Sequence, residues 1–142
     1  MPSINKSVLL PYAAERMFDL VARVEDYPAF LPWCAGTAVD PCVDGVRARV
    51  DIAYRGIRQS FTTRNLHRPP GEIAMQLVDG PFRSLSGRWL FHPLASDACK
   101  VELRLDYEMR AGLLGTALAP VFGQIAGSLV EAFEQRAEDI YE

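Results

Sequence analysis

Histidine and cysteine are scarce in this sequence, which has two histidines and three cysteines in 142 residues. Cys34, Cys42 and Cys99 are odd in number, widely spaced and without a CxxC pair, so neither a disulfide framework nor a zinc site is indicated. His67 and His92 lie on different expected strands with no cysteine or carboxylate at ligand spacing, which argues against a metal centre. We therefore expect buried free thiols and ordinary strand histidines.

Motifs for nucleotide binding and catalysis are also missing. The sequence contains no G-x-G-x-x-G, no P-loop and no G-x-S-x-G around Ser84 or Ser86. Acidic pairs such as Glu25 with Asp26 fall where the pattern predicts solvent, so we expect them to serve solubility rather than acid–base catalysis. We predict no cofactor, no metal and no catalytic side chain. A cyclase-like activity that depends on pocket shape alone stays open.

Composition is that of an ordinary globular protein. Hydrophobic residues make up 49% and charged residues 23%, which argues against the disordered, fibrous and membrane classes. A length of 142 residues fits a single domain, 1–142, with a full core. The first seventeen residues contain one lysine before a very short apolar run, and Glu15 follows soon after, unlike a secretory or transit peptide. We expect a cytoplasmic protein.

Alternation of apolar and polar residues predicts that most of the chain is β-strand. In residues 46–54 the even positions are apolar and most odd positions are charged, which gives one buried and one solvated face. Expected strands cover residues 3–10, 37–43, 46–54, 57–67, 72–78, 85–92 and 100–110. Short breaks such as Gly80-Pro81 separate them. Strands in series with short turns favour an antiparallel sheet over a βαβ arrangement.

Two helices are expected, over residues 13–23 and 113–141. The second is the longer, and its first eighteen residues carry no charge, although glycine, proline and serine dilute them below a convincing membrane span. Its apolar stripe consists of Leu118, Phe122, Ile125, Leu129 and Phe133. Closing the core of a curved sheet would explain this stripe. Additional apolar surface at Leu114, Val121 and Val130 favours a hydrophobic pocket or a partner.

Residues 24–34, VEDYPAFLPWC, combine four large apolar side chains with Pro28 and Pro32. Each proline lacks a backbone donor and disfavours helical geometry in the residue before it, so a helix here is limited to one or two turns. The segment is expected to form a stiff apolar lid or lining, unless it is a connecting helix that merely plugs the core.

The motifs DYPAFLPWC, SFTTRN, DGPF, LSGRWLF and VFGQIAGSLVEAFEQRA, in this order, resemble the START-type family of polyketide-cyclase-like proteins. Within that family the chain is similar to the branch of bacterial ribosome-association toxins and mitochondrial ubiquinone-binding chaperones. This resemblance implies an α+β helix-grip fold, in which a curved antiparallel sheet wraps around a long C-terminal helix and two short helices follow the first strand. The residues that carry it are Tyr27, Pro28, Phe30, Pro32, Trp33, Cys34, Phe61, Gly80, Pro81, Phe82, Gly87, Trp89, Phe91, Phe133 and Arg136.

An apolar cavity between the sheet and the long helix is a further implication of the resemblance. It implies binding of ubiquinone or a related polyprenyl lipid rather than a known reaction, and hence a quinone chaperone that supports respiration. The residues expected to line the cavity are Phe30, Trp33, Phe61, Met75, Trp89, Leu118, Phe122, Ile125 and Leu129.

Positive charge is concentrated in the middle of the chain. Residues 47–88 contain eight arginines and three acidic residues, a net charge of +5, while the rest of the chain carries −8. Outward-facing Arg47, Arg49, Arg58 and Arg64 are expected to contact phosphate, of RNA or of lipid headgroups, although a charged solvent face would show the same bias.

The alternative function is therefore a toxin-type protein that binds the large ribosomal subunit and blocks subunit association. A quinone carrier would instead touch an anionic membrane surface transiently, at the bacterial inner membrane. No DNA partner is expected.

Overall fold

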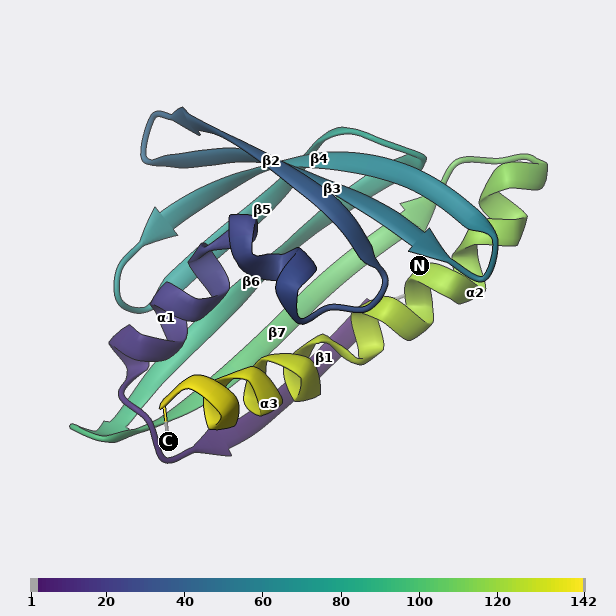
Figure 1. Ribbon diagram of the computed structural model, residues 1–142. Helices are drawn as coiled ribbons and strands as arrows, with labels where there is room; N and C mark the ends of the chain where they lie inside the picture. Colours follow the sequence, from purple (N-terminus) through teal and green to yellow (C-terminus); the bar gives the residue numbers. More distant parts are fainter. Residues whose placement is uncertain (1–2, 142) are drawn as a thin grey trace.

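The computed structural model describes residues 3–141, which form a seven-stranded antiparallel sheet and a set of helices (Figure 1). The strands are β1 (Ser3–Leu10), β2 (Cys34–Cys42), β3 (Gly45–Tyr54), β4 (Ile57–Arg68), β5 (Glu72–Asp79), β6 (Phe82–Ala95) and β7 (Ala98–Met109). Their order in the sheet is β1-β7-β6-β5-β4-β3-β2, and every neighbouring pair is antiparallel. The predicted α+β class and strand meander are confirmed.

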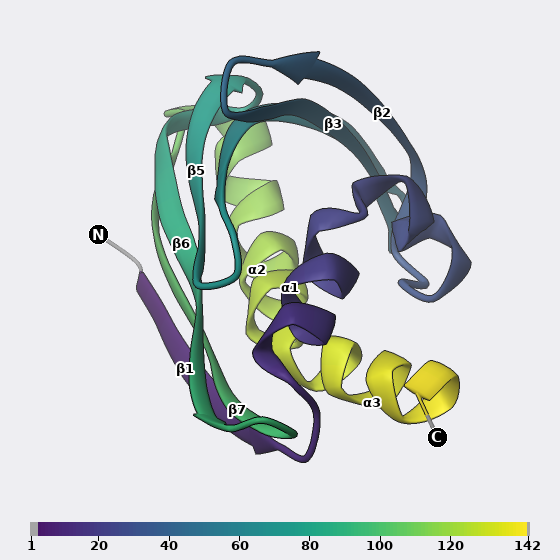
Figure 2. The ribbon, with the colours of Figure 1, turned by 90° about the vertical axis from the view of Figure 1, so that its left-hand side faces the viewer.

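Within residues 3–141, four helical segments accompany the sheet. They are α1 (Ala14–Ala22), the 3-10 helix η1 (Val24–Ala29), α2 (Leu113–Gly127) and α3 (Leu129–Tyr141). Figure 2 shows the sheet curving around α2, while α1 and η1 cover the side that the sheet leaves open. This arrangement confirms the predicted helix-grip fold with two short helices after the first strand.

The helix α1 is amphipathic and buries Met17, Phe18, Leu20 and Val21. After Arg23 the chain tightens into η1, whose six residues contain Pro28. A proline inside so short a helix removes a donor and prevents extension, as the sequence predicts. Here we call residues 24–33 the lid.

Of the strands in residues 3–141, β2 and β6 extend furthest beyond the ranges that their apolar patterns predict. The strand β2 begins at Cys34, three residues before its predicted start, and a register shift between Cys34 and Gly36 interrupts its pairing with β3. The strand β6 runs to Ala95, where its last four residues are exposed. Backbone pairing extends these strands beyond the part whose side chains are buried, and alternation reports only on side chains.

The C-terminal helix is interrupted, whereas the sequence predicts one helix over residues 113–141. Ser128 separates α2 from α3, and its hydroxyl donates to the carbonyl oxygen of Ile125 at 2.9 Å. Glycine and serine are poor helix formers, and a serine hydroxyl competes with the backbone for carbonyl oxygens. The carbonyl oxygen of Gly127 instead accepts a hydrogen bond from Lys6 Nζ on β1, at 2.6 Å.

Length and composition alone would allow the stretch Leu113–Tyr141 to cross a membrane, since it has 29 residues and contains an 18-residue window with a mean hydropathy of 1.6. Core helices of soluble proteins pass the same test, so the criterion is weak evidence. In the structure Leu118, Phe122, Ile125 and Phe133 are buried against the sheet and the lid, which explains the apolar stripe.

Candidate ligand-binding site

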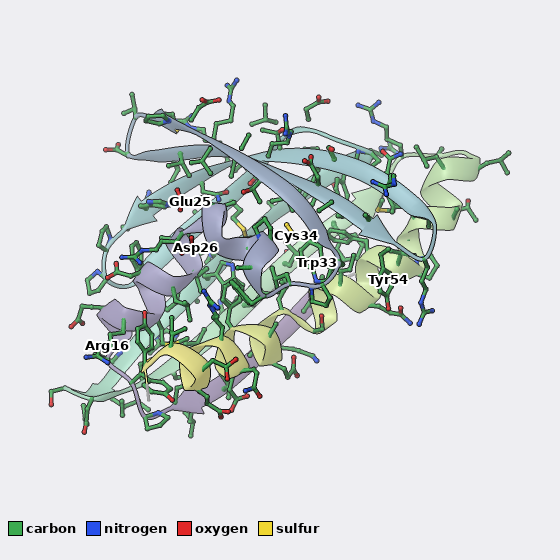
Figure 3. The ribbon with its side chains drawn as sticks, in the orientation of Figure 1. Arg16, Glu25, Asp26, Trp33, Cys34 and Tyr54 are labelled. Carbon is green, nitrogen blue, oxygen red and sulfur yellow. The ribbon has the colours of Figure 1, made fainter. Side chains whose placement is uncertain are left out.

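A cavity of about 90 Å³ lies between the inner face of the sheet, α2 and the lid. Sixteen of its eighteen lining side chains are hydrophobic. The lining consists of Val24, Tyr27, Trp33, Ala48, Val50, Phe61, Thr63, Asn65, Met75, Leu85, Trp89, Leu103, Leu105, Phe122, Ile125, Ala126, Leu129 and Phe133. Figure 3 shows Trp33 where the lid joins β2.

Strand alternation and helical periodicity place these side chains. On β7, residues 101, 103, 105 and 107 point inward and are buried, so Leu103 and Leu105 reach the cavity. On α2, Phe122, Ile125 and Ala126 are spaced three and four apart and share one helix face. The cavity therefore lies between the buried face of the sheet, formed by alternate strand residues, and the buried face of α2, formed by residues three and four apart.

Aromatic side chains surround one end of the cavity. The ring centre of Phe122 lies 4.8 Å from those of Phe82 and Tyr107, and 6.0 Å from that of Phe61. All of these pairs are close to perpendicular, the geometry that aromatic quadrupoles favour. Gly80 makes room for this cluster, because its φ is +149° and an added Cβ would lie 2.7 Å from Phe61 Cβ.

The lid is fixed to α3 and α1 by aromatic and polar contacts. Phe30 and Tyr27 both pack on Phe133, with ring centres 5.3 and 5.4 Å apart, and the Arg136 guanidinium lies 4.9 Å from the centre of the Phe30 ring. The Tyr27 hydroxyl donates to the carbonyl oxygen of Val21 at 2.5 Å. Burial raises the pKa of Tyr27 well above its usual range, so this hydroxyl keeps its proton.

Seven of the nine side chains predicted to line a cavity do surround it. They are Trp33, Phe61, Met75, Trp89, Phe122, Ile125 and Leu129. Phe30 and Leu118 lie outside the lining. Phe30 packs between Phe133 and Arg136, and Leu118, 1% exposed, is enclosed in the core closer to the start of α2.

Two lining residues, Thr63 and Asn65, are polar and were missed by sequence reasoning, which selected apolar side chains only. Both lie on the inner face of β4, 5% and 7% exposed, and Thr63 Oγ1 donates to Asn65 Oδ1 at 2.7 Å. The signal was present in the alternation. Phe61 was predicted to point inward, and residues two and four further along a strand share its face.

The outer face of the sheet carries the predicted arginines. Arg47, Arg49, Arg58 and Arg64 are all exposed, and Arg47 on β3 is directly opposite Arg64 on β4. Arg49 is partly neutralised, because its Nε lies 3.1 Å from Asp51 Oδ1. Arg47, Arg58 and Arg64 make no ion pair with any residue in 3–141. Arg47 also lies directly opposite Asp40 on β2, but the two form no ion pair, so all three arginines present positive side chains to solvent.

The titratable groups show no arrangement suited to acid–base chemistry in the cavity. His67 packs edge-on against Phe18, its Nε2 has no partner within the described residues, and burial lowers its pKa. His92 lies on the outer face, with Nε2 3.3 Å from Glu102 Oε1, a pairing that spacing did not predict. No cluster of three or more potential metal ligands occurs in residues 3–141.

The three cysteines are free thiols. Cys34 and Cys99 are buried, and Cys42 is half-buried. Burial raises the pKa values of Cys34 and Cys99, which keeps both groups protonated and unreactive.

Comparison with known proteins gives consistent matches along the chain. The family described as polyketide cyclase/dehydrase and lipid transport matches residues 10–134. Ribosome association toxin RatA of Escherichia coli K12 is 43% identical, over 99% of this chain and 90% of the toxin. Coenzyme Q-binding protein COQ10 homolog B, mitochondrial, of Xenopus laevis is 31% identical, over 96% of this chain and 58% of that protein.

Among solved structures, the ZhuI aromatase/cyclase from Streptomyces sp. R1128 superimposes with a TM-score of 0.86. The alignment covers 99% of this chain and 96% of the cyclase, at 17% identity. At this identity the likeness concerns the fold alone.

Proposed function

Because this chain belongs to the family of polyketide cyclases, dehydrases and lipid-transport proteins, we propose that it binds ubiquinone or a related polyprenyl lipid and acts as a carrier. The observation that carries the proposal is the cavity between the sheet, α2 and the lid, whose lining is apolar except at Thr63 and Asn65 on β4. An apolar pocket with few polar groups is typical of small-molecule binding sites. The coenzyme Q-binding relative supports this choice of ligand. No catalytic role is proposed for any side chain.

A quinone with its isoprenoid chain requires a larger space than this cavity provides. Its volume of about 90 Å³ is below the roughly 300–1,000 Å³ of typical ligand pockets. Binding therefore requires α2 or the lid to move away from the sheet. The interruption at Ser128 gives α2 a pivot relative to α3, and the lid meets α3 mainly through side chains.

Native mass spectrometry after incubation with extracted bacterial lipid tests the carrier proposal. The wild-type protein is expected to retain a lipid of quinone mass. Ala126→Leu places a larger apolar side chain into the cavity and should abolish retention, while the protein stays folded. Ala117→Leu makes the same change on an exposed position of the same helix and should retain lipid like the wild type. A wild-type protein that retains no lipid contradicts the proposal.

Binding to the large ribosomal subunit is the second candidate function. It is supported by the exposed side chains of Arg47, Arg58 and Arg64, which form no ion pair within residues 3–141, and by the relative named ribosome association toxin RatA. Arginine forks match phosphate geometry, and the outer face is separate from the cavity, so both functions are compatible in one chain. In sedimentation assays, a variant with Arg47, Arg58 and Arg64 all replaced by glutamine should no longer sediment with ribosomes. Arg49→Gln, which removes an arginine already paired with Asp51, is the matched control.

The proposed carrier works in the cytoplasm and touches an anionic membrane surface transiently when it exchanges ligand. The same outer-face arginines would provide that contact. Flotation with anionic vesicles and sedimentation with ribosomes, carried out on the same protein, show which of the two partners it binds.

A further inference from the structure

Thr63 and Asn65 are the two polar side chains in the lining of the cavity. They are also, with Glu102 on the outer face, the most buried polar side chains in residues 3–141. Burying a polar group among apolar side chains costs free energy unless it forms a hydrogen bond. Their position therefore requires a physical explanation.

Their mutual hydrogen bond satisfies only part of this pair. Thr63 Oγ1 uses its single hydrogen to donate to Asn65 Oδ1, at 2.7 Å. The two hydrogens of Asn65 Nδ2 have no acceptor among residues 3–141. A carboxamide has two donor hydrogens, and a hydroxyl oxygen keeps acceptor capacity after donating. Asn65 thus offers unused donors at the wall of the cavity, beside an acceptor on Thr63.

Packing alone does not explain the pair. Valine has nearly the shape of threonine and leucine that of asparagine, and an apolar pair would line this wall without unsatisfied donors. The neighbouring side chain on the same strand face, Phe61, is apolar and joins the aromatic cluster around Phe122. The wall thus combines a cluster of aromatic rings with one pair of hydrogen-bonding side chains.

We propose that Thr63 and Asn65 form a head-group subsite that recognises a carbonyl oxygen on the ring of the bound lipid. Asn65 Nδ2 donates to that oxygen, and Thr63 orients the carboxamide through the 2.7 Å hydrogen bond. Phe61 and Phe122 cover the ring, and the apolar chain extends along the rest of the lining. The inference rests on the function proposed above and narrows the ligand to lipids with a carbonyl-bearing ring, excluding plain hydrocarbons.

Equilibrium titration with two probes tests this subsite. Decylubiquinone has a ring with two carbonyl and two methoxy oxygens and a ten-carbon chain, whereas decylbenzene has a ring and the chain without oxygen atoms. The wild-type protein should bind decylubiquinone about tenfold more tightly. Asn65→Leu should remove that preference by weakening decylubiquinone binding about tenfold, with decylbenzene binding unchanged or improved. Thr63→Val, which frees the carboxamide to rotate, should weaken decylubiquinone binding several-fold.

The outcomes separate this inference from the carrier proposal. Wild-type protein that binds both probes equally keeps the carrier proposal and overturns the subsite. Wild-type protein that binds neither probe overturns both. Asn65→Leu with unchanged affinity for decylubiquinone, or with an equal loss for both probes, assigns the pair a structural role and overturns the subsite. Thermal unfolding shows whether Asn65→Leu is folded. If it is not, Thr63→Val decides alone: unchanged affinity for decylubiquinone, or an equal loss for both probes, overturns the subsite.

Discussion

Glu102 on β7 is the most buried charged side chain of residues 3–141, 7% exposed. It lies between the side chains of Arg104 and His92. Arg104 Nε donates to Glu102 Oε2 at 2.8 Å, and His92 Nε2 lies 3.3 Å from Oε1. The Arg104 hydrogen bond is the main cause that lowers the pKa of Glu102 below its ordinary 4.5. The charged carboxylate therefore stabilises the fold.

This pairing predicts a pH-dependent stability difference. Glu102→Gln should lower the free energy of unfolding at pH 7 by about 1–2 kcal/mol, the contribution of a charge-assisted hydrogen bond. Because the folded-state pKa is depressed, the stabilisation is complete above pH 4.5 and is lost as pH falls through the folded-state value. Urea unfolding of both proteins between pH 7 and pH 3 should show the difference shrinking.

Glu131→Gln is the control for this experiment. Glu131 pairs with Lys6 at 3.2 Å, but its side chain is 61% exposed, so its loss should change the unfolding free energy by less than about 1 kcal/mol. A difference between Glu102→Gln and wild type that stays constant down to pH 3 would contradict the assigned cause.

At the scale of elements, the carrier proposal predicts that the interruption between α2 and α3 controls access to the cavity. An added Cβ at Gly127 meets no atom within 4 Å, so Gly127→Ala fits without strain and favours helix by about 1 kcal/mol. We expect this variant to slow the binding of decylubiquinone in stopped-flow measurements several-fold, because α2 pivots less readily. Gly71→Ala, in open space at the turn between β4 and β5, is the matched control. Equal binding rates for both variants would show that α2 does not pivot at this point.

The lid gives a second prediction at this scale. Phe30 holds the lid to Phe133 and Arg136 without lining the cavity. Phe30→Ala should therefore raise the dissociation rate of bound decylubiquinone several-fold, since the lid opens more often. Leu94→Ala, at an exposed position near the end of β6, should leave the rate unchanged. If the dissociation rate of Phe30→Ala equalled that of wild type, ligand exchange would have to proceed elsewhere.

The elements themselves were largely predictable, because alternation and helical stripes directly reflect burial. Period 2 predicted the inner face of β3, and period 3.6 predicted that Leu118 and Phe122 share a buried face. Periodicity cannot distinguish a side chain that borders a cavity from one that is fully packed, so Leu118 was included with the lining. Selecting apolar residues excluded Asn65 although its strand position faces inward. Glu102 was missed because its burial depends on neighbouring strands and on Arg104.

At the scale of the whole molecule, the two faces of the sheet differ in charge. The outer face of β3 and β4 presents unpaired Arg47, Arg58 and Arg64, while the cavity on the other face is apolar. Release of counterions from phosphates makes such binding weaken steeply with salt.

Replacing Arg47, Arg58 and Arg64 together by glutamine should therefore flatten the salt dependence of ribosome or anionic-vesicle binding. For an RNA partner, each lost phosphate contact reduces the slope of log K against log salt by about 0.7–0.9. Binding measured at several salt concentrations between about 50 and 200 mM gives the slope for the wild-type protein and for the triple variant. A triple variant with the wild-type slope would exclude these arginines from the interface. Its retention of decylubiquinone should stay unchanged, since none of the three lines the cavity.

The sheet order also has a consequence for how the chain folds. The first strand, β1, pairs with the last, β7, so that Ser3 lies opposite Asp106. During synthesis β1 has no partner strand until β7, about a hundred residues later, has been made. The hairpins from β2 to β7, in contrast, bring together residues that are near in sequence. Such a distant pairing carries a large loop-closure cost and slows folding. The helices α2 and α3, which close the cavity, emerge later still, so a nascent chain exposes its apolar interior until they have been synthesised. Folding of this protein is therefore expected to depend on chaperones more than its modest length would suggest.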